Sequence, residues 1–260
     1  MANPRLLLEH ALVPGAEIAL DEGQARHVGT VLRLAPGDAL RVFNATDGEW
    51  RARVAAKTKR GMTIIIETLA RAPQAVPDLD LLFAPVKRHA TDLIVEKATE
   101  LGVRRIRPVI TQRTIAETVR LDRLNAIARE AAEQTERFDA PEISDPVSLA
   151  RALDGWSAAR PLIFADEAGD DETQAWGGAA GRAQPLLDAL SAAAQEAGAS
   201  RKLALLIGPE GGFAPEERRM LRALSFVTPV SLGPRILRAE TAVIAALTLI
   251  QAQWGDWRGA

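Results

Sequence analysis

Two glycine-containing turns carry the charged residues whose types and spacing could do chemistry. The first lies in LLIGPEGGFAPEE (residues 205–217), where an apolar segment runs into three glycines and then into acidic residues. The second lies in GPRILRAE (residues 233–240) and places Arg235, Arg238 and Glu240 beside apolar neighbours. Two guanidinium groups at an apolar pocket suit a planar, partly anionic ligand. One of these arginines could instead be structural, since Arg238 and Glu240 could pair with each other or cap the turn.

Neither turn has the pattern of a phosphate or dinucleotide site. The first lacks the lysine of a phosphate-binding loop and departs from the GxGxxG spacing, while Pro215, Glu216 and Glu217 favour a helix start over a bound phosphate. Glycines instead allow the backbone to approach a ligand closely. One such turn alone is commonly structural. Because both turns follow apolar segments and precede helices, we expect them to meet at one sheet edge and form a pocket.

Composition narrows the chemistry that these turns can support. The 260 residues are 47% hydrophobic and include no cysteine, which excludes disulfides, thiolate catalysis and cysteine-bound zinc. The three histidines, His10, His27 and His89, are scattered along the chain, so we expect no metal site. Near the C-terminus the longest apolar run covers residues 242–247, far below the roughly 20 residues of a membrane helix. Since the start also lacks a signal pattern, we expect a cytoplasmic protein without membrane contact.

Charge is distributed unevenly along the chain. The net charge is −2, but residues 87–113 carry seven Lys or Arg against three acids, while residues 114–200 carry seven against sixteen. Residues 51–60 hold five positive charges and no acid. A strip that faces RNA and a solvated strand edge that discourages aggregation fit this segment about equally well. The acidic segment should face away from RNA or contact protein.

The hydrophobic pattern predicts two domains. Short strands at residues 39–43, 49–54 and 62–67 indicate a small β-domain at 1–72, and the proline-containing segment 70–78 is the expected linker. Strands then alternate with helices over 77–260, which predicts a parallel sheet covered on both faces. The expected strands are 78–85, 104–110, 161–165, 203–208 and 226–232, and the expected helices are 91–101, 121–134, 215–224 and 239–254, with a weaker alanine-rich helix after residue 185. Residues 166–185 are acidic and glycine-rich and are expected to form a mobile surface loop.

Five segments taken together resemble one known family. They are HVGTVLRLAPGDALRVF (27–43), LIVEKATELGVRRIRPVITQRT (93–114), REAAEQTERFDAPEI (129–143), LLIGPEGGF (205–213) and LGPRILRAETA (232–242). Over nearly the whole chain this order resembles the RsmE family, methyltransferases that act on N3 of uridine 1498 in 16S rRNA. That family is part of the SPOUT class of S-adenosylmethionine enzymes. Each segment alone is weak, whereas five in order are highly specific.

The resemblance implies a fold that periodicity does not predict. Periodicity alone gives a plain doubly wound sheet, and knots are nearly absent among folds. The family instead implies a PUA-like β-barrel followed by a trefoil-knotted parallel sheet flanked by helices, with the glycine turns in the knot. It also implies a homodimer whose closing helix packs on the partner, and 16S rRNA within the small ribosomal subunit as substrate. Two departures are small: Ala214 stands where a Ser or Thr helix cap is usual, and Ala239 where relatives often have Thr.

The resemblance also assigns roles to residues. S-adenosylmethionine carries an activated methyl group, so the chain must bind it, align it and control the charge of the uracil. The expected cofactor-binding residues are Phe83, Phe164, Ile207, Gly208, Gly211, Gly212, Leu232, Gly233, Ile236, Leu237, Thr241 and Ala242. Arg238, and after it Arg235, should stabilise the uracil anion as the N3 proton leaves, while Glu210 or Glu240 could accept that proton or only orient a neighbour. The expected RNA-binding cations are Arg26, Arg33, Arg51, Arg53, Lys87, Arg88 and Arg113.

Two other functions stay open on sequence grounds. A SPOUT methyltransferase could act on another RNA target, such as a ribose 2′-hydroxyl. A non-catalytic RNA-binding or ribosome-assembly factor could use the PUA-like domain, although the intact glycine turns disfavour this function.

Overall fold

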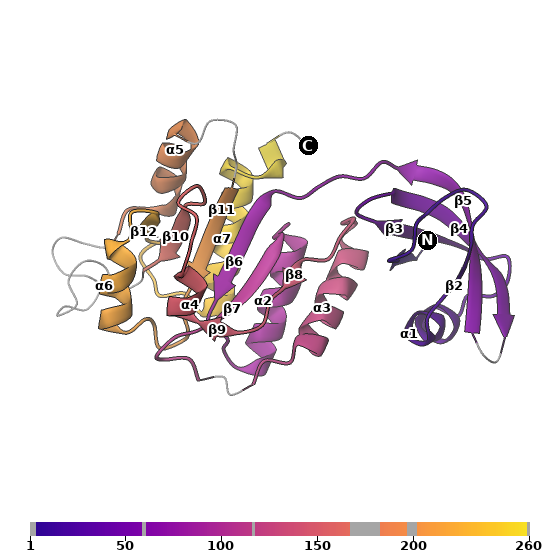
Figure 1. Ribbon diagram of the computed structural model, residues 1–260, viewed down its shortest axis with the longest axis horizontal. Coiled ribbons are helices and arrows are strands. Elements are labelled where there is room, and N and C mark those ends of the chain that lie inside the picture. Colours follow the sequence, from indigo (N-terminus) through magenta and orange to yellow (C-terminus); the bar gives the residue numbers. More distant parts are fainter. Residues whose placement is uncertain (1–3, 59–60, 116–117, 167–182, 197–201, 259–260) are drawn as a thin grey trace. The chain divides into compact units, whose positions relative to one another are not determined.

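The chain forms two compact units (Figure 1). The computed structural model describes residues 4–58, 61–115, 118–166, 183–196 and 202–258. Residues 1–75 and 132–140 make up the first unit, and residues 76–131 and 141–260 make up the second. The sequence predicts that the chain passes once from the first domain to the second, between residues 72 and 77. In the structure, residues 132–140 belong to the first unit again. The surface loop expected at 166–185 lies, apart from its ends, outside the described residues.

The first unit is a five-stranded, mostly antiparallel sheet with strand order β1-β3-β4-β5-β2. Among its described strands, only the neighbours β1 and β3 pair in parallel. Alternate residues of the long strands point into one core, as Met62, Ile64 and Ile66 do. Its elements are β1 (Arg5–Leu7), β2 (Glu17–Ala19), α1 (Glu22–Arg26), a π-helical turn (His27–Val31), β3 (Ala39–Asn44), β4 (Gly48–Thr58) and β5 (Gly61–Arg71).

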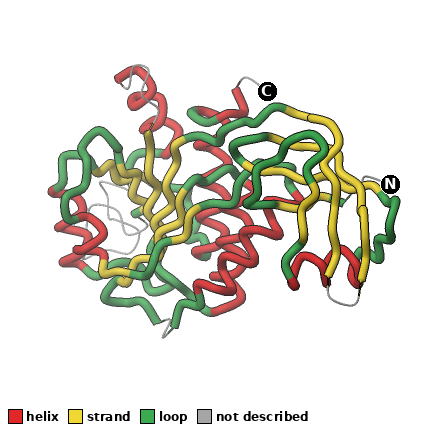
Figure 2. Tube along the Cα trace, turned by 45° about the vertical axis from the view of Figure 1, so that its right-hand side comes forward, coloured by secondary structure: helices red, strands yellow, loops and turns green. Residues whose placement is uncertain are grey.

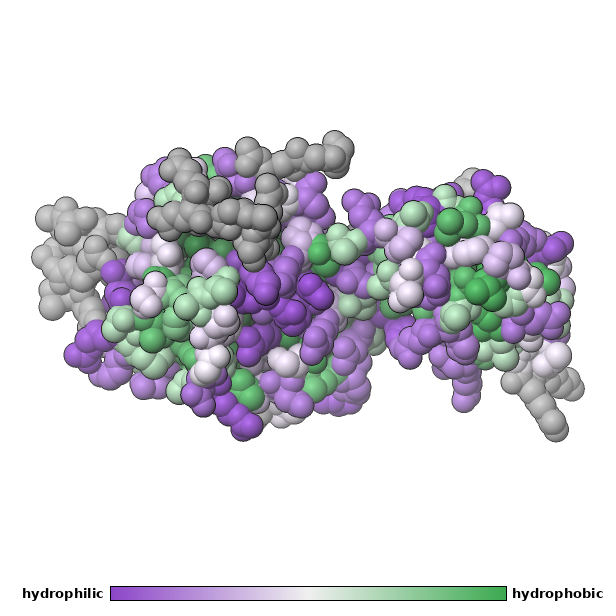
Figure 3. Space-filling view, turned by 45° about the horizontal axis from the view of Figure 1, so that its top comes forward, coloured by the Kyte–Doolittle hydropathy of each residue, from purple (hydrophilic) through white to green (hydrophobic). Residues whose placement is uncertain are grey.

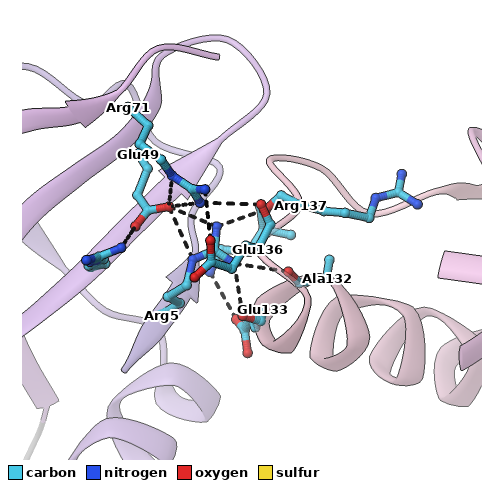
Figure 4. A network of polar contacts seen from close by, with 9 residues as sticks. Arg5, Glu49, Arg71, Ala132, Glu133, Glu136 and Arg137 are labelled. Carbon is cyan, nitrogen blue, oxygen red and sulfur yellow. Dashed lines mark hydrogen bonds and ion pairs between the residues drawn. The ribbon is translucent and has the colours of Figure 1, made fainter. Parts of the chain in front are cut away.

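A buried ion cluster holds residues 132–140 to this unit (Figure 4). The carboxylate of Glu49 is fully buried and accepts hydrogen bonds from Arg5 (3.1 Å), Arg41 (2.9 Å) and Arg71. Arg5 also donates to the carbonyl oxygens of residues 132, 133 and 137, at 3.2, 2.9 and 3.0 Å. Burial alone would raise the pKa of Glu49, but hydrogen bonds from Arg71 and Arg41 and the charge of Arg5 hold it below its usual value.

The second unit is a parallel sheet with helices on both faces, which confirms the predicted fold class. Its strand order is β12-β10-β11-β6-β7-β8, and β9 pairs with the end of β7. The strands are β6 (Asp78–Phe83), β7 (Arg105–Ile110), β8 (Glu142–Ile143), β9 (Val147–Ser148), β10 (Leu162–Ala165), β11 (Lys202–Ile207) and β12 (Val227–Val230). The helices are α2 (Arg88–Glu100), α3 (Leu121–Gln134), α4 (Leu149–Leu153), α5 (Leu186–Glu196), α6 (Pro215–Ala223) and α7 (Ala239–Gln253), followed by a 3-10 turn (Asp256–Arg258).

Successive residues of the central strands supply two separate cores. In β6, Leu81 and Phe83 pack with α2, α3, α5 and α7 on one face of the sheet. The intervening Leu82 packs with Phe164 and with α4 and α6 on the other face. Figures 1 and 2 show the strands of this unit lying side by side with helices against the sheet. This two-sided burial explains the nearly continuous apolar strands.

Helix α7 belongs mainly to the core of its own unit. Ala246, Leu247 and Ile250 are completely buried in it. That face is therefore occupied by this chain and is not free to bind a second copy. The residues of α7 that stay partly exposed lie on another face and include Ile244, Ala245 and Thr248.

The surface shows apolar side chains in small patches separated by hydrophilic ones (Figure 3). Among the described residues, the large apolar side chains with the greatest exposure are Ile115 (72%), Val31 (65%) and Ile236 (61%). None of the described helices is long and apolar enough to cross a bilayer. The described acidic and histidine side chains also form no cluster of three or more with the arrangement of a metal site.

Candidate functional site

The two glycine turns form a pocket at the carboxyl ends of β10, β11 and β12. Its volume is about 200 Å³. Turn 1, as we call residues 208–214, joins β11 to α6, and turn 2, residues 231–238, joins β12 to α7. Both turns contribute lining residues, together with residues at the end of β10 and the start of α7. The sequence prediction that the turns meet at one sheet edge is thus confirmed.

Turn 1 is shaped by glycines with distinct roles. A Cβ added at Gly208 would lie 2.5 Å from a ring carbon of Phe213, so the closeness of that ring requires glycine. Phe213 is fixed in turn by edge-to-face packing on Phe164, with ring centroids 5.0 Å apart. Gly212 has φ of 67°, a conformation that glycine adopts without strain. At Gly211, however, a Cβ would make only ordinary contacts with Arg113, at 3.7 Å.

The end of turn 1 is braced by a buried carboxylate. Glu217 accepts hydrogen bonds from the backbone N–H of Ala214 (3.0 Å) and from that of Gln112 (2.9 Å). The first bond completes half of a capping box, so the start of α6 is held although Ala214 offers no capping side chain. Arg113 adds a bond to the carbonyl oxygen of Gly211 at 3.0 Å. The segment that follows β7 therefore fixes the outer side of the turn.

Turn 2 presents two arginines at the rim of the pocket. Gly233 has φ of 111°, which disfavours any side chain there, and Ser231 contacts its backbone. The side chains of Arg235 and Arg238 are exposed and line the pocket. Among the described residues, neither side chain forms an ion pair or a hydrogen bond, and Arg238 does not pair with Glu240. Both guanidinium groups are therefore available to a ligand.

The pocket floor contains a residue that sequence reasoning missed. Asp166 follows β10, is almost completely buried and lines the pocket. Its carboxylate accepts hydrogen bonds from Arg218 (2.9 and 3.2 Å) and from Arg222 (2.9 and 2.7 Å), both on α6. This cluster ties α6, and with it the end of turn 1, to β10. The position of Asp166 directly after an apolar strand was the available sequence signal.

The structure brings most of the predicted pocket residues together. The residues that were predicted and do line the pocket are Ile207, Gly208, Glu210, Gly212, Leu232, Gly233, Arg235, Ile236, Leu237, Arg238 and Ala242. The lining residues that were not predicted are Ala165, Asp166, Pro209, Val230, Ser231 and Ala239. Gly211, Thr241 and Glu240 do not line the pocket. The expectation that Phe83 and Phe164 form its walls is wrong. The side chain of Phe83 is completely buried in the core on one face of the sheet, and that of Phe164 is completely buried in the core on the other face.

The predicted RNA-binding cations lie in both units and are solvent-exposed. In the first unit, Arg53 forms a surface ion pair with Glu67 at 2.9 Å, and Arg33 has a left-handed backbone with φ of 58°. Lys57, which was not predicted, donates to the carbonyl oxygens of Gly29 and Leu34 and so binds both the π-helical turn and the segment after it. The remaining exposed candidates are Arg26, Arg51, Lys87, Arg88 and Arg113.

Comparisons with known proteins assign the chain to a family. The profile of an RNA methyltransferase domain matches residues 73–251, and that of an RNA methyltransferase PUA domain matches residues 20–67. The ribosomal RNA small subunit methyltransferase E of Synechocystis is 30% identical over 250 residues, which is 95% of this chain and 77% of the relative. That of Rickettsia conorii is 29% identical over 252 residues, 96% of each chain.

Two solved structures share the whole fold. A methyltransferase from Legionella pneumophila, in complex with S-adenosylmethionine, is 29% identical with a TM-score of 0.80, and the match covers 98% of this chain and 100% of that one. The ribosomal RNA small subunit methyltransferase E of Neisseria gonorrhoeae, also bound to S-adenosylmethionine, is 26% identical with a TM-score of 0.79, covering 98% and 99%. With its PUA-like first unit and its parallel α/β second unit, the chain belongs to the ribosomal RNA small subunit methyltransferase E family of RNA methyltransferases.

Proposed function

We propose that this chain transfers a methyl group from S-adenosylmethionine to N3 of uridine 1498 of 16S rRNA in the small ribosomal subunit. The observation that carries the proposal is the pocket between the two glycine turns, with two unpaired arginines at its rim. It lies where parallel α/β folds bind ligands, outside the carboxyl ends of the strands. Family membership and the two cofactor-bound neighbours support the choice of cofactor.

The residues present fit S-adenosylmethionine. Gly208, Gly212 and Gly233 bring backbone to the pocket lining, and a Cβ at Gly233 would meet no atom within 4 Å, so the backbone there is open. Ile207 and Leu237 supply apolar wall. Close backbone approach with apolar sides suits adenine and ribose and needs no cation. The proposed cofactor-binding set is Ile207, Gly208, Gly212, Leu232, Gly233, Ile236, Leu237 and Ala242. When bound, the cofactor supplies the activated methyl group.

The charged rim suits a uracil whose N3 proton must leave. N3 lies on the pairing edge, so the nucleotide must be unpaired or flipped out to react. The free guanidinium of Arg238, with that of Arg235 from the same turn as second choice, is proposed to stabilise the developing uracil anion. Glu210 lines the pocket whereas Glu240 does not, which favours Glu210 as the proton acceptor.

The assembly and setting of the enzyme are part of the proposal. We propose a homodimer, with the partly exposed side of α7 near Ala245 and Thr248 as one contact, because Ala246 is enclosed by its own chain. Light scattering should then give twice the chain mass of 27.9 kDa. We further propose an RNA-binding domain at 1–72, a methyltransferase domain at 77–260 and a cytoplasmic location with the ribosomal substrate.

Primer extension on small-subunit RNA tests the activity. RNA from cells that lack the chain should be read through at the target uridine, and RNA from cells that express it should stop the polymerase there, because N3 methylation blocks pairing. Mass spectrometry of the nucleosides separates this product from a 2′-O-methyl product. Calorimetric titration with S-adenosylmethionine distinguishes a methyltransferase of either kind, which should bind the cofactor, from a non-catalytic RNA-binding factor, which should not. Read-through in both RNA samples would contradict the proposed target.

A further inference from the structure

A second and larger cavity, lined by other residues, lies in the same unit as the cofactor pocket. Its volume is about 690 Å³, within the ~300–1,000 Å³ typical of ligand sites. It is formed by the residues that follow β6 and the start of α2, together with residues 115 and 118–120 and the start of α3. We call it the α2–α3 cleft.

Charge pairing inside the cleft leaves two cations without partners. Of the residues that the structure describes, four cations and two carboxylates line it. Asp92 is engaged by Arg123 at 2.7 Å, and Asp122 is engaged by Arg120 at 2.9 Å. The other two cations, Lys87 and Arg88, are exposed and form no ion pair or side-chain hydrogen bond with any described residue. The described lining residues therefore offer net positive charge, and both carboxylates among them are already paired with arginines.

The walls of the cleft are suited to more than a small anion. Pro85, Val86 and Val119 supply apolar surface, and Ile115, which is 72% exposed, stands at its edge. Apolar surface of this kind can cover the flat face of a base or ribose while cations bind the phosphate. Helix α2, 13 residues long, also begins at the cleft without a side-chain cap, which adds partial positive charge beside Lys87.

The cleft opens at the same sheet edge as the cofactor pocket, one strand away. Strands β6 and β11 are neighbours with Phe83 opposite Ile207, and the N–H of Ala84 bonds to the carbonyl oxygen of Ile207 at 3.0 Å. Residues 85–87 thus leave the sheet beside the start of turn 1. The segment after β7 lines the cleft and also reaches turn 1, where Arg113 binds the carbonyl oxygen of Gly211.

From this arrangement we infer that the α2–α3 cleft binds the sugar–phosphate backbone of the RNA substrate beside the target nucleotide, with Lys87 and Arg88 as its phosphate ligands. This inference rests on the proposed function, because it takes RNA as the substrate. An RNA strand that presents one nucleotide at the cofactor pocket has its neighbouring nucleotides within reach of the next strand end. Charge complementarity favours a polyanion there.

Salt-dependent binding of small ribosomal subunits lacking the methyl group tests this inference. Two phosphate contacts contribute about 1.4 to the slope of log affinity against log salt for single-stranded RNA. The double variant Lys87→Ala with Arg88→Ala should therefore flatten this slope by about 1 to 2 and weaken binding about 10-fold or more near 0.1 M salt. In methyl transfer it should raise KM for subunits and leave kcat at saturation within about twofold. Lys87→Arg with Arg88→Lys keeps both charges and should keep the slope.

A matched control removes the same charge from the opposite edge of the sheet. Arg104 and Lys202 lie at the amino ends of β7 and β11, so Arg104→Ala with Lys202→Ala should bind subunits like wild type. Equal weakening in both double variants, or an unchanged slope in the Lys87/Arg88 variant, overturns the inference. Unchanged heats of S-adenosylmethionine titration and an unchanged Tm show that the variants fold. A different result would separate the two proposals. If the wild-type chain does not methylate the subunits but its binding to them still depends on Lys87 and Arg88, the inference about the cleft stands and the proposed activity is overturned.

Discussion

Arg238 occupies a position where helix physics disfavours its charge. It is the N-cap of α7 and makes no capping hydrogen bond. The amino end of a helix carries partial positive charge, and Ser, Thr, Asp or Asn are the residues that stabilise it. The arginine therefore costs stability at this site, while its side chain is left free beside the pocket. Such a choice is typical of a functional residue rather than a structural one.

We predict that Arg238→Ala slows methyl transfer without an equal loss of cofactor binding. If the guanidinium stabilises the uracil anion, turnover should fall by about 10² to 10³-fold, the usual effect of losing one such donor. Lysine should restore only part of the rate, because it keeps the charge and loses the planar fork. Raising the pH should partly rescue the alanine variant, since uracil then loses its proton without help. Single-turnover assays on small subunits between neutral and alkaline pH measure this.

A companion substitution separates catalysis from structure. Arg238→Ser introduces a good N-cap, so it should raise the free energy of unfolding by about 1 kcal/mol while lowering turnover as alanine does. Chemical unfolding of the two variants gives the comparison. If the alanine variant's rate follows that of wild type at every pH, Arg238 only shapes the pocket, and the catalytic role passes to Arg235.

At the scale of elements, the two turns depend on their glycines unequally. A side chain at Gly233 is strained by its φ of 111°, whereas a Cβ at Gly211 meets only ordinary contacts. We predict that Gly233→Val weakens S-adenosylmethionine binding by at least about 10-fold, given strain on the order of 1–3 kcal/mol in a turn that must hold the ligand. Gly211→Ala should bind nearly normally and serves as the matched control. Calorimetric titration measures both, and normal heats for Gly233→Val would refute the role assigned to turn 2.

Elements with strong local patterns were predictable from the sequence, and short or distant ones were not. The bounds of α3 agree with the prediction, and those of β3, α6 and α7 differ by only a residue. By contrast, β1, β2, β8 and β9 have two or three residues, too few to show a period. The returning segment 132–140 depends on Arg5, more than 120 residues away, and no local pattern encodes that contact.

The predicted pocket walls Phe83 and Phe164 were wrong for a related reason, although most of the predicted lining residues were right. Strand ends identify the pocket, but the alternation along a strand decides which side chain faces it. Phe83 and Phe164 are near the correct edge, yet both point into the cores, while Ala165 and Asp166, just beyond, reach the pocket. The trefoil knot implied by the family resemblance stays a prediction, because periodicity carries no information on threading.

At the scale of the whole molecule, each unit contains a carboxylate that several arginines engage and whose pKa is lowered: Glu49 in the first and the partly buried Asp78 in the second. In the second unit, Asp78 accepts hydrogen bonds from Arg105 at 2.7 Å and from Arg160 at 2.9 Å. Burial alone would raise the pKa of Asp78, but the hydrogen bond and charge of Arg160, with the charge of Arg105, lower it. Glu49 in the first unit is shifted in the same direction. Because the clusters share no residue, their effects on stability should be additive.

These shifts predict how the chain responds to acid. A carboxylate with a lowered folded-state pKa contributes stability above its unfolded-state pKa, near 4, and that contribution is lost as pH falls through the folded-state value. We therefore expect the free energy of unfolding to change little from pH 7 to about 5 and to fall steeply below about pH 4. Glu49→Gln should cost about 2–3 kcal/mol at pH 7, less than the ~3–5 kcal/mol of fully buried pairs, because Arg41 and Arg71 remain partly exposed.

The same variant should also lose less stability on acidification than wild type, because the group that titrates in the first unit is gone. Urea unfolding at pH 7 and pH 3.5 measures this. Fluorescence reports on the first unit when Trp50, the one tryptophan of residues 1–75, is the only tryptophan kept in each chain compared. Glu67→Gln, which removes the exposed partner of Arg53, is the control and should change stability by less than about 1 kcal/mol. An equal loss between the two pH values in Glu49→Gln and wild type would show that the Glu49 cluster does not set the acid sensitivity of the first unit.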